Sequence, residues 1–265
     1  KHKLDLIPVL DKTKKVEKII FWNDIFKKKK SENEKKTNIV IMSGGEGKRL
    51  LPFTKVLPKP LIPLNDKPII SHIIDSFENQ GFKNINVIVN YKADLLNTYM
   101  SNYQKKSKIK IFKEKNPLGT VGGLYLLKNK VNDNFILTNC DILTADLQYE
   151  EILNFHKKYN YDLTLVASLR NFSIPYGVCE INKNTSLNKI KEKPKFNFLV
   201  SIGMYVMNKK VLSSIKNNSK LDITNLIKRL KNKKYKIGVF PIDDKSWIDV
   251  GNWSDYNQAV IKDER

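Results

Sequence analysis

The chain has 265 residues, of which 41% are hydrophobic and 10% aromatic, and it carries a formal net charge of +21. This size and composition can supply the core of a large domain, and no apolar run approaches the roughly 18 residues that a membrane-spanning helix needs. Almost all of the positive charge is lysine scattered along the chain. Nucleic-acid modules interleave arginine and aromatic residues on one face, and no such signature appears. We therefore interpret the lysines as a solvated surface that also attracts small anions.

The two cysteines, Cys140 and Cys179, are too few for a disulfide framework. No Cys/His cluster has the spacing of a zinc site. The N-terminus, KHKLDLIPVLD, has no signal-peptide pattern. We therefore expect a cytoplasmic protein, and an N-terminus that is a trimmed end rather than a natural start.

The predicted elements begin with a strand, a turn and a second strand over residues 4–22, then a short helix at NDIFKKKK and a polar linker. Beyond residue 36, buried strand runs alternate with segments of helical periodicity. The strands are TNIVIMS, NINVIVNY, IKIFKE and NFILTNCD, and the helices span 67–81, 93–106 and 121–131. This alternation predicts an α/β fold, a Rossmann-like, mostly parallel twisted sheet with helices on both faces. Ligands of such sheets bind beyond the carboxyl ends of the strands.

The stretch SGGEGKRLLPFTKVLPKPLIPL follows the first of these buried strands. Gly44, Gly45 and Gly47 have no Cβ, so their backbone N–H groups can approach a phosphate closely. The spacing is not that of a P-loop. Arg49 follows the glycines, and Lys59 stands between two prolines that stiffen its segment. Together, these features predict a phosphate-binding site with two cations.

The same stretch resembles the signature loop of the sugar-1-phosphate nucleotidyltransferases, roughly G-G-x-G-T-R-L-x-P-L-T-x-x-x-P-K-P. Later segments match that family in the right order: EKNPLGTVGGL (114–124), NCD (139–141), YGV (176–178), EKP (192–194), SIGMYVM (201–207) and WIDVGNWSDY (247–256). The resemblance implies a nucleotide-diphospho-sugar transferase fold for a catalytic domain over residues 37–265. It also implies that a sugar-phosphate oxygen attacks the α-phosphorus of a nucleoside triphosphate directly and releases pyrophosphate.

Site residues follow from the same resemblance. Catalysis without a covalent intermediate consists of positioning and charge neutralisation. The catalytic residues would be Arg49, Lys59 and Asp141, with Mg²⁺ as cofactor held by Asp141 and Asp249. Nucleotide-binding positions would be Gly44, Gly45, Gly47, Lys48, Glu114, Gly119, Thr120 and Gly122, and sugar-phosphate positions would be Glu192, Lys193, Gly177 and Ser201.

Three positions depart from the family pattern. Lys48 replaces the usual Thr or Ser before the arginine and adds a cation beside the triphosphate. Cys140 replaces the glycine of N-G-D, which bears on the tightness of that turn. Ser201 stands where many relatives have Asn, and its shorter reach bears on the sugar contacts.

Glu114 bears on the choice of base. Relatives that use thymidine or uridine triphosphates commonly have Gln there, and a Gln amide offers both a donor and an acceptor. An ionised carboxylate only accepts hydrogen bonds and pairs best with two adjacent donors, which guanine presents as N1–H and N2–H₂. This favours GTP. The alternative is that Glu114 faces solvent or Lys115 and contacts no base.

Residues 1–36 resemble the last strand pair and helix of a CBS domain, on LDLIPVLDKTKKVEKIIFWNDI. A CBS pair joined to this catalytic type resembles the glucosamine-1-phosphate guanylyltransferases that lead to legionaminic acid and surface glycans. The expected reaction is therefore GMP transfer from GTP to glucosamine 1-phosphate or N-acetylglucosamine 1-phosphate. The alternatives are a mannose- or heptose-1-phosphate guanylyltransferase, an enzyme that uses CTP, UTP or dTTP, or a catalytically silent sensor of nucleotide sugars. Homo-oligomerisation is left open.

Overall fold

The computed structural model describes residues 6–10, 16–21, 34–103 and 107–263, in two compact units, residues 1–33 and 34–265. In the first unit β1 (Leu6–Leu10) and β2 (Val16–Phe21) pair antiparallel, so the strands predicted there are confirmed. The short helix predicted at NDIFKKKK lies outside the described residues. The assignment of this unit to a CBS domain stays a prediction.

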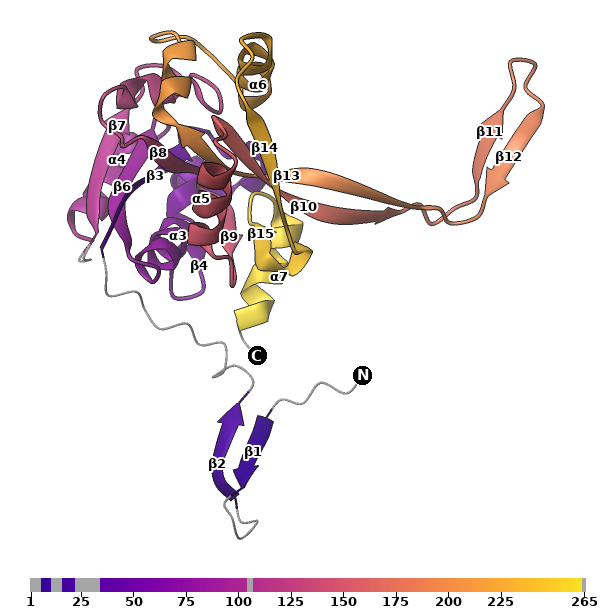
Figure 1. Ribbon diagram of the computed structural model, residues 1–265, viewed down its shortest axis with the longest axis horizontal. Coiled ribbons are helices and arrows are strands. Elements are labelled where there is room, and N and C mark those ends of the chain that lie inside the picture. The colour runs from indigo at the N-terminus through magenta and orange to yellow at the C-terminus, as the bar shows by residue number, and fades with distance from the viewer. Residues whose placement is uncertain (1–5, 11–15, 22–33, 104–106, 264–265) are drawn as a thin grey trace. The chain divides into compact units, whose positions relative to one another are not determined.

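The second unit is built on a seven-stranded sheet with the order β14-β10-β13-β8-β3-β6-β7 (Figure 1). Only β13 pairs antiparallel with its neighbours in this sheet, so the mostly parallel sheet is confirmed. The strands are β3 (Lys35–Ser43), β6 (Phe82–Val89), β7 (Lys108–Lys113), β8 (Asn134–Asn139), β10 (Leu163–Ser173), β13 (Lys195–Asn208) and β14 (Ile237–Ile242).

Helices cover both faces of this sheet, as its strand sequences require. In β3, Ile39 and Ile41 belong to one apolar cluster, while Val40 and Met42 belong to another. Successive side chains of a strand point to opposite faces, so a strand that is apolar at every position needs cover on both. The first cluster includes residues of α3 (Ile69–Glu78), α4 (Ala93–Ser101), α5 (Tyr149–Lys158) and α7 (Trp253–Asp263), and the second includes residues of α6 (Ile223–Asn232), η3 (Gly122–Leu127) and η4 (Lys209–Ser214).

The α-helix expected over residues 121–131 is wrong, because the chain forms the 3₁₀ helix η3 there. The cause is close backbone approach at two successive glycines. A Cβ at Gly122 would lie 2.7 Å from the Ser219 carbonyl oxygen, and one at Gly123 would overlap the Glu114 carboxylate. Two glycines also weaken an α-helix by about 1 kcal/mol each relative to alanine.

Shorter elements connect the sheet to the loops at its edge. They are η1 (Lys48–Leu50), α2 (Phe53–Val56), η2 (Lys59–Leu61), β4 (Pro63–Leu64), β5 (Lys67–Pro68), β9 (Ile142–Thr144), η5 (Asp244–Ser246) and β15 (Trp247–Asp249). The β9 and β15 strands pair antiparallel, which brings the segment after β8 beside the segment before α7. None of the described helices is both long and apolar enough to cross a membrane.

β10 and β13 continue together beyond the sheet as a two-stranded arm, which Figure 1 shows projecting from the body of the unit. Their ladder runs without a break from Ala167 opposite Ser201 to Ser173 opposite Lys195. The arm ends in a small hairpin of β11 (Val178–Ile181) and β12 (Leu187–Lys191). We call residues 169–200 the arm.

Candidate active site

A cleft of about 510 Å³ opens at the carboxyl ends of β3 and β8. These strands are parallel neighbours in the sheet, so the segments that follow them meet at one edge. Ten of the residues that the sequence singled out line this cleft: Gly44, Gly45, Gly47, Lys48, Arg49, Lys59, Glu114, Gly119, Thr120 and Asp141.

The glycine turn after β3 packs directly on the segment that carries Lys59. Gly47 has φ +67°, and a Cβ there would lie 2.8 Å from Thr54 Cγ2 and 3.2 Å from Lys59 Cβ. Gly45 differs, since no atom lies within 4 Å of the position that its Cβ would take. The protein therefore leaves no room for a side chain at Gly47 but leaves room at Gly45. Lys48 is exposed and pairs with Glu46 at 3.1 Å.

Two cations approach the Asp141 carboxylate from the opening stretch of the domain. Lys59 lies in η2, directly after Pro58, and only 7% of its surface is exposed. Its Nζ donates a hydrogen bond to Asp141 Oδ2. Arg49 Nη2 lies 3.9 Å from the same oxygen, and its side chain is mostly exposed. A buried and a solvent-accessible cation thus flank one carboxylate.

Asp249 lies beside Asp141 because β15 pairs with β9. In that pairing Asp249 is opposite Ile142, and the Val250 N–H donates to the Asp141 carbonyl oxygen at 2.9 Å. A Cβ at Gly251 would lie 2.6 Å from Asp249 Oδ1, 2.8 Å from Asp141 Oδ2 and 2.9 Å from Arg49 Nη2. Burial, and secondly the charge of Asp141, raises the pKa of Asp249. The Gly251 N–H, which donates to Asp249 Oδ1 at 2.7 Å, opposes that rise.

This carboxylate pair fits a hard divalent cation. Asp141 Oδ1 is buried and has no hydrogen-bond partner among the described residues. Carboxylate oxygens are the ligands that Mg²⁺ prefers, and Mg²⁺ commonly uses only one or two of them with phosphate oxygens and water. Across the described residues no group of three or more His, Cys, Asp or Glu gathers at one point. Asp141, which lines the cleft, and Asp249, which lies beside it outside the described lining, are thus the donors for such an ion.

Cys140 precedes Asp141, and its thiol is buried. Burial raises its pKa to about 11, and the neighbouring Asp141 charge adds to the rise. The thiolate, not the thiol, is the nucleophilic form of cysteine. Cys140 is therefore unsuited to covalent catalysis, in agreement with the direct attack that the resemblance implies.

Glu114 closes the other side of the cleft, directly after β7. It is 3% exposed, so the alternative in which it faces solvent is wrong. A Cβ at Gly44 would lie 2.8 Å from its Oε2, and one at Gly123 would overlap its Oε1. Burial raises the pKa of Glu114 to about 7, and the Leu118 and Gly123 backbone amides partly offset the rise. The carboxyl group therefore titrates near neutral pH in a glycine-lined niche.

The segment after Glu114 is held by Asp222, a residue that the sequence reading missed. Asp222 Oδ1 accepts the Thr120 N–H at 3.1 Å, and Thr120 Oγ1 accepts the Ile223 N–H at 2.8 Å. Gly119 has φ +77°, and its missing Cβ leaves room for the Asp222 carboxylate. Gly122 packs on the Ser219 carbonyl and does not line the cleft. Its expected role in shaping the nucleotide pocket stays a prediction.

Other lining residues were also missed: Met42, Pro117, Leu118, Asn139, Cys140 (noted only as a departure) and Lys220. Asn139 belongs to the NCD segment, so the motif itself could have revealed it. Lys220 comes from a loop 79 positions beyond Asp141 and has no local signal.

The four positions expected to bind the sugar phosphate lie on the arm side of the molecule, and the described cleft lining does not include them. Gly177, Glu192 and Lys193 form a corner where the arm meets its terminal hairpin. A Cβ at Gly177 would lie 3.2 Å from Glu192 Oε2, and Lys193 Nζ lies 3.9 Å from Glu192 Oε1. Ser201 lies in β13, where its hydroxyl donates to the Tyr205 hydroxyl at 3.2 Å.

Comparisons with known proteins identify the family of this chain. A family model described as "Nucleotidyl transferase" matches residues 38–265. A mannose-1-phosphate guanyltransferase of Yarrowia lipolytica is 34% identical over 185 residues, which cover 66% of this chain and 50% of that protein. Mannose-1-phosphate guanyltransferase 2 of Candida glabrata is 30% identical over 228 residues, or 82% of this chain and 62% of that protein. The chain thus spans about half to three fifths of the length of these relatives.

Solved structures share the fold. HddC from Yersinia pseudotuberculosis, complexed with GMP-PN, superposes with a TM-score of 0.67 at 24% identity and covers 85% of this chain and 99% of its own. A putative glucose-1-phosphate thymidylyltransferase from Bacillus anthracis, in complex with a sucrose, gives 0.65 at 21% identity and covers 85% and 94%. At these identities the likeness concerns the fold, which agrees with the nucleotide-diphospho-sugar transferase fold expected from the sequence.

Proposed function

Because the chain belongs to the nucleotidyl transferase family, we propose that it transfers GMP from GTP to a sugar 1-phosphate and releases pyrophosphate. The observation that carries the proposal is the convergence of Arg49, Lys59, Asp141 and Asp249 beside the glycine turn. A phosphoryl-transfer site needs positioned cations and metal ligands more than it needs a nucleophilic side chain. The cleft offers both at one point.

The geometry supports a role for each of these groups. The glycine turn offers backbone N–H groups to the triphosphate, with Gly45 leaving the closest approach open. The sugar-phosphate oxygen bonds to the α-phosphorus while the bond to the bridging oxygen of pyrophosphate breaks. Arg49, exposed at the cleft mouth, neutralises the charge that moves onto the leaving pyrophosphate. Lys59 is buried on a segment stiffened by prolines, and its contact with Asp141 Oδ2 orients the Asp141 carboxylate.

Asp141 and Asp249 would hold Mg²⁺. When bound, the ion supplies charge neutralisation to the phosphate oxygens. The two carboxylates orient toward the same space above Gly251, and the Asp249 carboxylate is fixed by the Gly251 N–H. Asp141 Oδ1 has no hydrogen-bond partner among the described residues, and Asp249 Oδ1 accepts one backbone N–H, that of Gly251. Both carboxylates can therefore also ligate a cation.

Two observations support GTP as the nucleotide. The sequence relatives are named as guanylyltransferases, and Glu114 lies in the cleft wall as a carboxyl group rather than an amide. In its ionised form Glu114 accepts hydrogen bonds from two adjacent donors, the edge that guanine N1–H and N2–H₂ presents.

For the sugar, the names of the relatives favour mannose 1-phosphate over the hexosamine 1-phosphates. Mannose 1-phosphate is therefore the first acceptor to test. Glucosamine 1-phosphate and N-acetylglucosamine 1-phosphate remain the second candidates. They rest on the CBS-like pattern of residues 1–36, whose place in a legionaminic acid route stays a prediction.

The test is pyrophosphate release by the purified protein with Mg²⁺. Mannose 1-phosphate and the two hexosamine 1-phosphates are each combined with GTP, CTP, UTP, dTTP and ATP. We expect GTP turnover that Asp141→Ala abolishes. Asp94→Ala is the matched control, because it removes a carboxylate from an exposed ion pair with Lys113 outside the cleft. Turnover with another nucleotide would overturn the guanine assignment, and silence with every pair would favour a catalytically silent sensor.

A further inference from the structure

Two segments that are far apart in the sequence, residues 118–122 and residues 219–223, pair at the wall of the cleft. The Leu221 N–H donates to the Leu118 carbonyl oxygen at 2.8 Å, and the Val121 N–H donates to the Leu221 carbonyl oxygen at 3.1 Å. All three of these residues are less than 5% exposed. The pairing is therefore buried, and the shape of the first segment depends on the second.

Two glycines allow the segments to approach this closely. Gly119 has φ +77°, and a Cβ there would lie 2.6 Å from Asp222 Oδ1 and 2.9 Å from the Leu221 carbonyl oxygen. A Cβ at Gly122 would lie 2.7 Å from the Ser219 carbonyl oxygen. A side chain at either position would push the segments apart. Glycine also has more conformational freedom than other residues, so the first segment needs a constraint from outside to keep one shape.

Asp222 and Thr120 each satisfy a backbone amide of the other segment. Asp222 is the N-cap residue of α6, a position at which an aspartate ordinarily accepts a backbone N–H of its own helix. Here its side chain makes no such bond, and Oδ1 accepts the Thr120 N–H at 3.1 Å. The Ile223 N–H at the start of α6 donates instead to Thr120 Oγ1 at 2.8 Å. The N-cap carboxylate of α6 thus holds the cleft wall rather than its own helix.

The first segment forms the cleft wall beside Glu114. Residues 118–120 line the cleft, whereas Asp222 is not part of the described lining. Leu118 connects the second segment to Glu114, because its carbonyl oxygen accepts from Leu221 while its backbone N–H interacts with the Glu114 carboxylate. The second segment therefore acts on the group that we propose to contact the base, and it does so through this wall.

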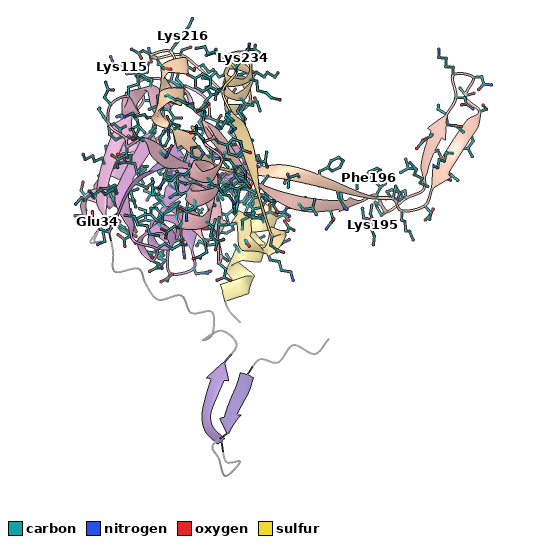
Figure 2. All side chains as sticks on the ribbon, viewed as in Figure 1. Glu34, Lys115, Lys195, Phe196, Lys216 and Lys234 are labelled. Carbon is teal, nitrogen blue, oxygen red and sulfur yellow. The ribbon has the colours of Figure 1, made fainter. Side chains whose placement is uncertain are left out.

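The same pairing brings Lys220 into the cleft lining. Lys220 precedes the paired residue Leu221, and it is exposed. Lys216, in the same loop, is also exposed but is not part of the described lining. Figure 2 labels Lys115 and Lys216, which lie near the starts of the two segments, at the same end of the unit. Lys220 and Lys216 are thus a matched pair of lysines that report on the position of this loop.

We propose that Asp222 is a positioning residue of the nucleotide site. It holds residues 118–121 in the shape that receives the nucleotide, and through Thr120 it couples this wall to the N-terminus of α6. This inference rests on the proposed function. A wall that is ordered before the nucleotide binds loses little conformational entropy on binding, so the affinity for the nucleotide is higher. Removing the Asp222 side chain should therefore weaken nucleotide binding and leave the groups around Asp141 unchanged.

The first test separates positioning from stability. Asp222→Ala should raise KM and the dissociation constant for GTP about tenfold, the effect of one lost hydrogen bond to a charged acceptor. Its kcat should change less than about twofold. Asp222→Asn keeps Oδ1 as an acceptor and should hold KM within about twofold of the wild type. An unchanged KM in Asp222→Ala, or an equal rise in Asp222→Asn, overturns the proposal.

Asn208→Ala is the matched control for this test. Asn208 is the N-cap residue of η4, where its side chain accepts the Lys210 N–H at 3.1 Å outside the described cleft lining. Its removal should lower the melting temperature, as the loss of a helix cap does, without changing KM for GTP. A rise in KM that equals that of Asp222→Ala would assign both effects to stability and would overturn the positioning role.

The second test needs no turnover and measures hydrogen exchange of the Ile223 amide. Saturating GTP should slow this exchange in the wild type, because the nucleotide stabilises the wall that carries Thr120 Oγ1. In Thr120→Val the acceptor is lost, so the amide should exchange faster and should not respond to GTP. Thr120→Ser keeps the hydroxyl and should restore the response. Amides of α5, outside the described cleft lining, are the control. An Ile223 response that persists in Thr120→Val overturns the coupling.

The third test uses the two lysines of the loop. The protein is treated with an amine-acetylating reagent with and without GTP, and the modified lysines are identified by mass spectrometry. GTP should protect Lys220 at least threefold and should leave Lys216 unchanged, because only Lys220 lines the cleft. In Asp222→Ala the protection of Lys220 should fall at the same occupancy of GTP. Equal protection in the variant and in the wild type would show that Asp222 does not position this loop.

Failure of the proposed function gives a different result from failure of this inference. If the wild type binds GTP and Asp222→Ala weakens that binding, but neither protein releases pyrophosphate, the proposed reaction fails and the positioning role stands. If both proteins bind and turn over GTP equally well, the reaction stands and the positioning role fails. If the wild type binds none of GTP, CTP, UTP, dTTP and ATP, both proposals fail.

Discussion

Lys59 Nζ donates to Asp141 Oδ2 across 82 residues of sequence, and both residues are buried. Asp249 lies beside this pair, so two carboxylates share one buried ammonium and one exposed guanidinium. An ion pair of this kind is costly to break from one side, because the remaining charge stays buried without a partner. These four groups balance in formal charge, but the buried Asp141 Oδ1 has no hydrogen-bond partner among the described residues, and a divalent cation would satisfy it.

Replacing Lys59 should cost more stability than replacing Asp141. Lys59→Met leaves two carboxylates facing each other and should destabilise the protein by about 3–5 kcal/mol. Asp141→Asn should cost less, because Lys59 can still interact with Asp249 and the repulsion between the two carboxylates is gone. Urea unfolding of both single variants and of the double variant gives the coupling free energy between the two residues. We expect the double variant to lose less stability than the two single variants lose together. Equal costs for the two single variants would contradict this description.

Gly251→Ala should remove activity without unfolding the chain. The new Cβ would lie under 3 Å from Asp249 Oδ1, Asp141 Oδ2 and Arg49 Nη2, so it must displace the groups that we propose to hold Mg²⁺. A misplacement of this size costs roughly 100-fold in rate. We also expect Mg²⁺ to raise the melting temperature of the wild type, and EDTA to reverse it, but not in Gly251→Ala. Unchanged Mg²⁺ stabilisation in the variant would show that the ion binds elsewhere.

Gly45→Ala and Gly47→Ala form a matched pair within one turn. At Gly45 the protein leaves space for a Cβ, so stability should hold while the affinity for GTP falls, because the Cβ would occupy the approach to the phosphates. At Gly47 the positive φ and the contact with Thr54 should destabilise the fold by at least 1–2 kcal/mol. Thermal unfolding and equilibrium GTP binding separate the two effects. A loss of stability in Gly45→Ala would show that the space beside Gly45 is not open.

GTP binding should depend on pH through Glu114. The pKa of this carboxyl group is raised to about 7, so the fraction that is ionised rises as the pH increases from 6 to 8. If the carboxylate accepts from guanine, KM for GTP falls over this range. Glu114→Gln should flatten the profile and reduce discrimination against UTP and dTTP, whose imides suit an amide. A variant that keeps the wild-type pH profile would exclude Glu114 as the group that contacts the base.

His156 should make the protein less stable in acid. It is 1% exposed, and Nδ1 lies 2.8 Å from Thr164 Oγ1. Burial lowers its pKa from 6.5 to about 4. Between pH 6.5 and 4 the unfolded chain therefore binds a proton that the folded chain does not bind. His156 contributes its full stabilisation above pH 6.5, and the free energy of unfolding falls by about 3 kcal/mol as the pH falls toward 4. Denaturant unfolding from pH 7 to 4 should show a shallower loss in His156→Gln. An unchanged slope would assign the loss to other groups.

Much of the cleft could be predicted because its signals are local. Three patterns predicted cleft residues: a glycine turn after an apolar strand, a lysine between prolines, and an aspartate at the end of the NFILTNC run. Each pattern depends only on neighbouring residues in the sequence. Strand alternation then predicts that the segments after β3 and β8 meet at one edge. Asp222 and Lys220 gave no such signal, because only the packing of a distant loop brings Asp222 to the Thr120 N–H and Lys220 into the cleft lining. The expected helix at residues 121–131 failed because two glycines that approach other segments closely cannot be recognised as such before those segments are placed.

By itself the sequence determined the family, the parallel sheet and the chemical character of the cleft, since periodicity, glycine spacing and motif order are properties of neighbouring residues. Only the tertiary structure decided where the EKP segment, which is expected to bind the sugar phosphate, lies. The EKP segment is the same three residues whether it closes on its own cleft or projects on an arm. In the structure it lies beyond the ladder from Ser168 to Ser173, in which β10 and β13 stay paired outside the sheet. That pairing joins residues 22 positions apart at Ser173 and Lys195 and 32 positions apart at Ser168 and Val200, a relationship that no local pattern encodes.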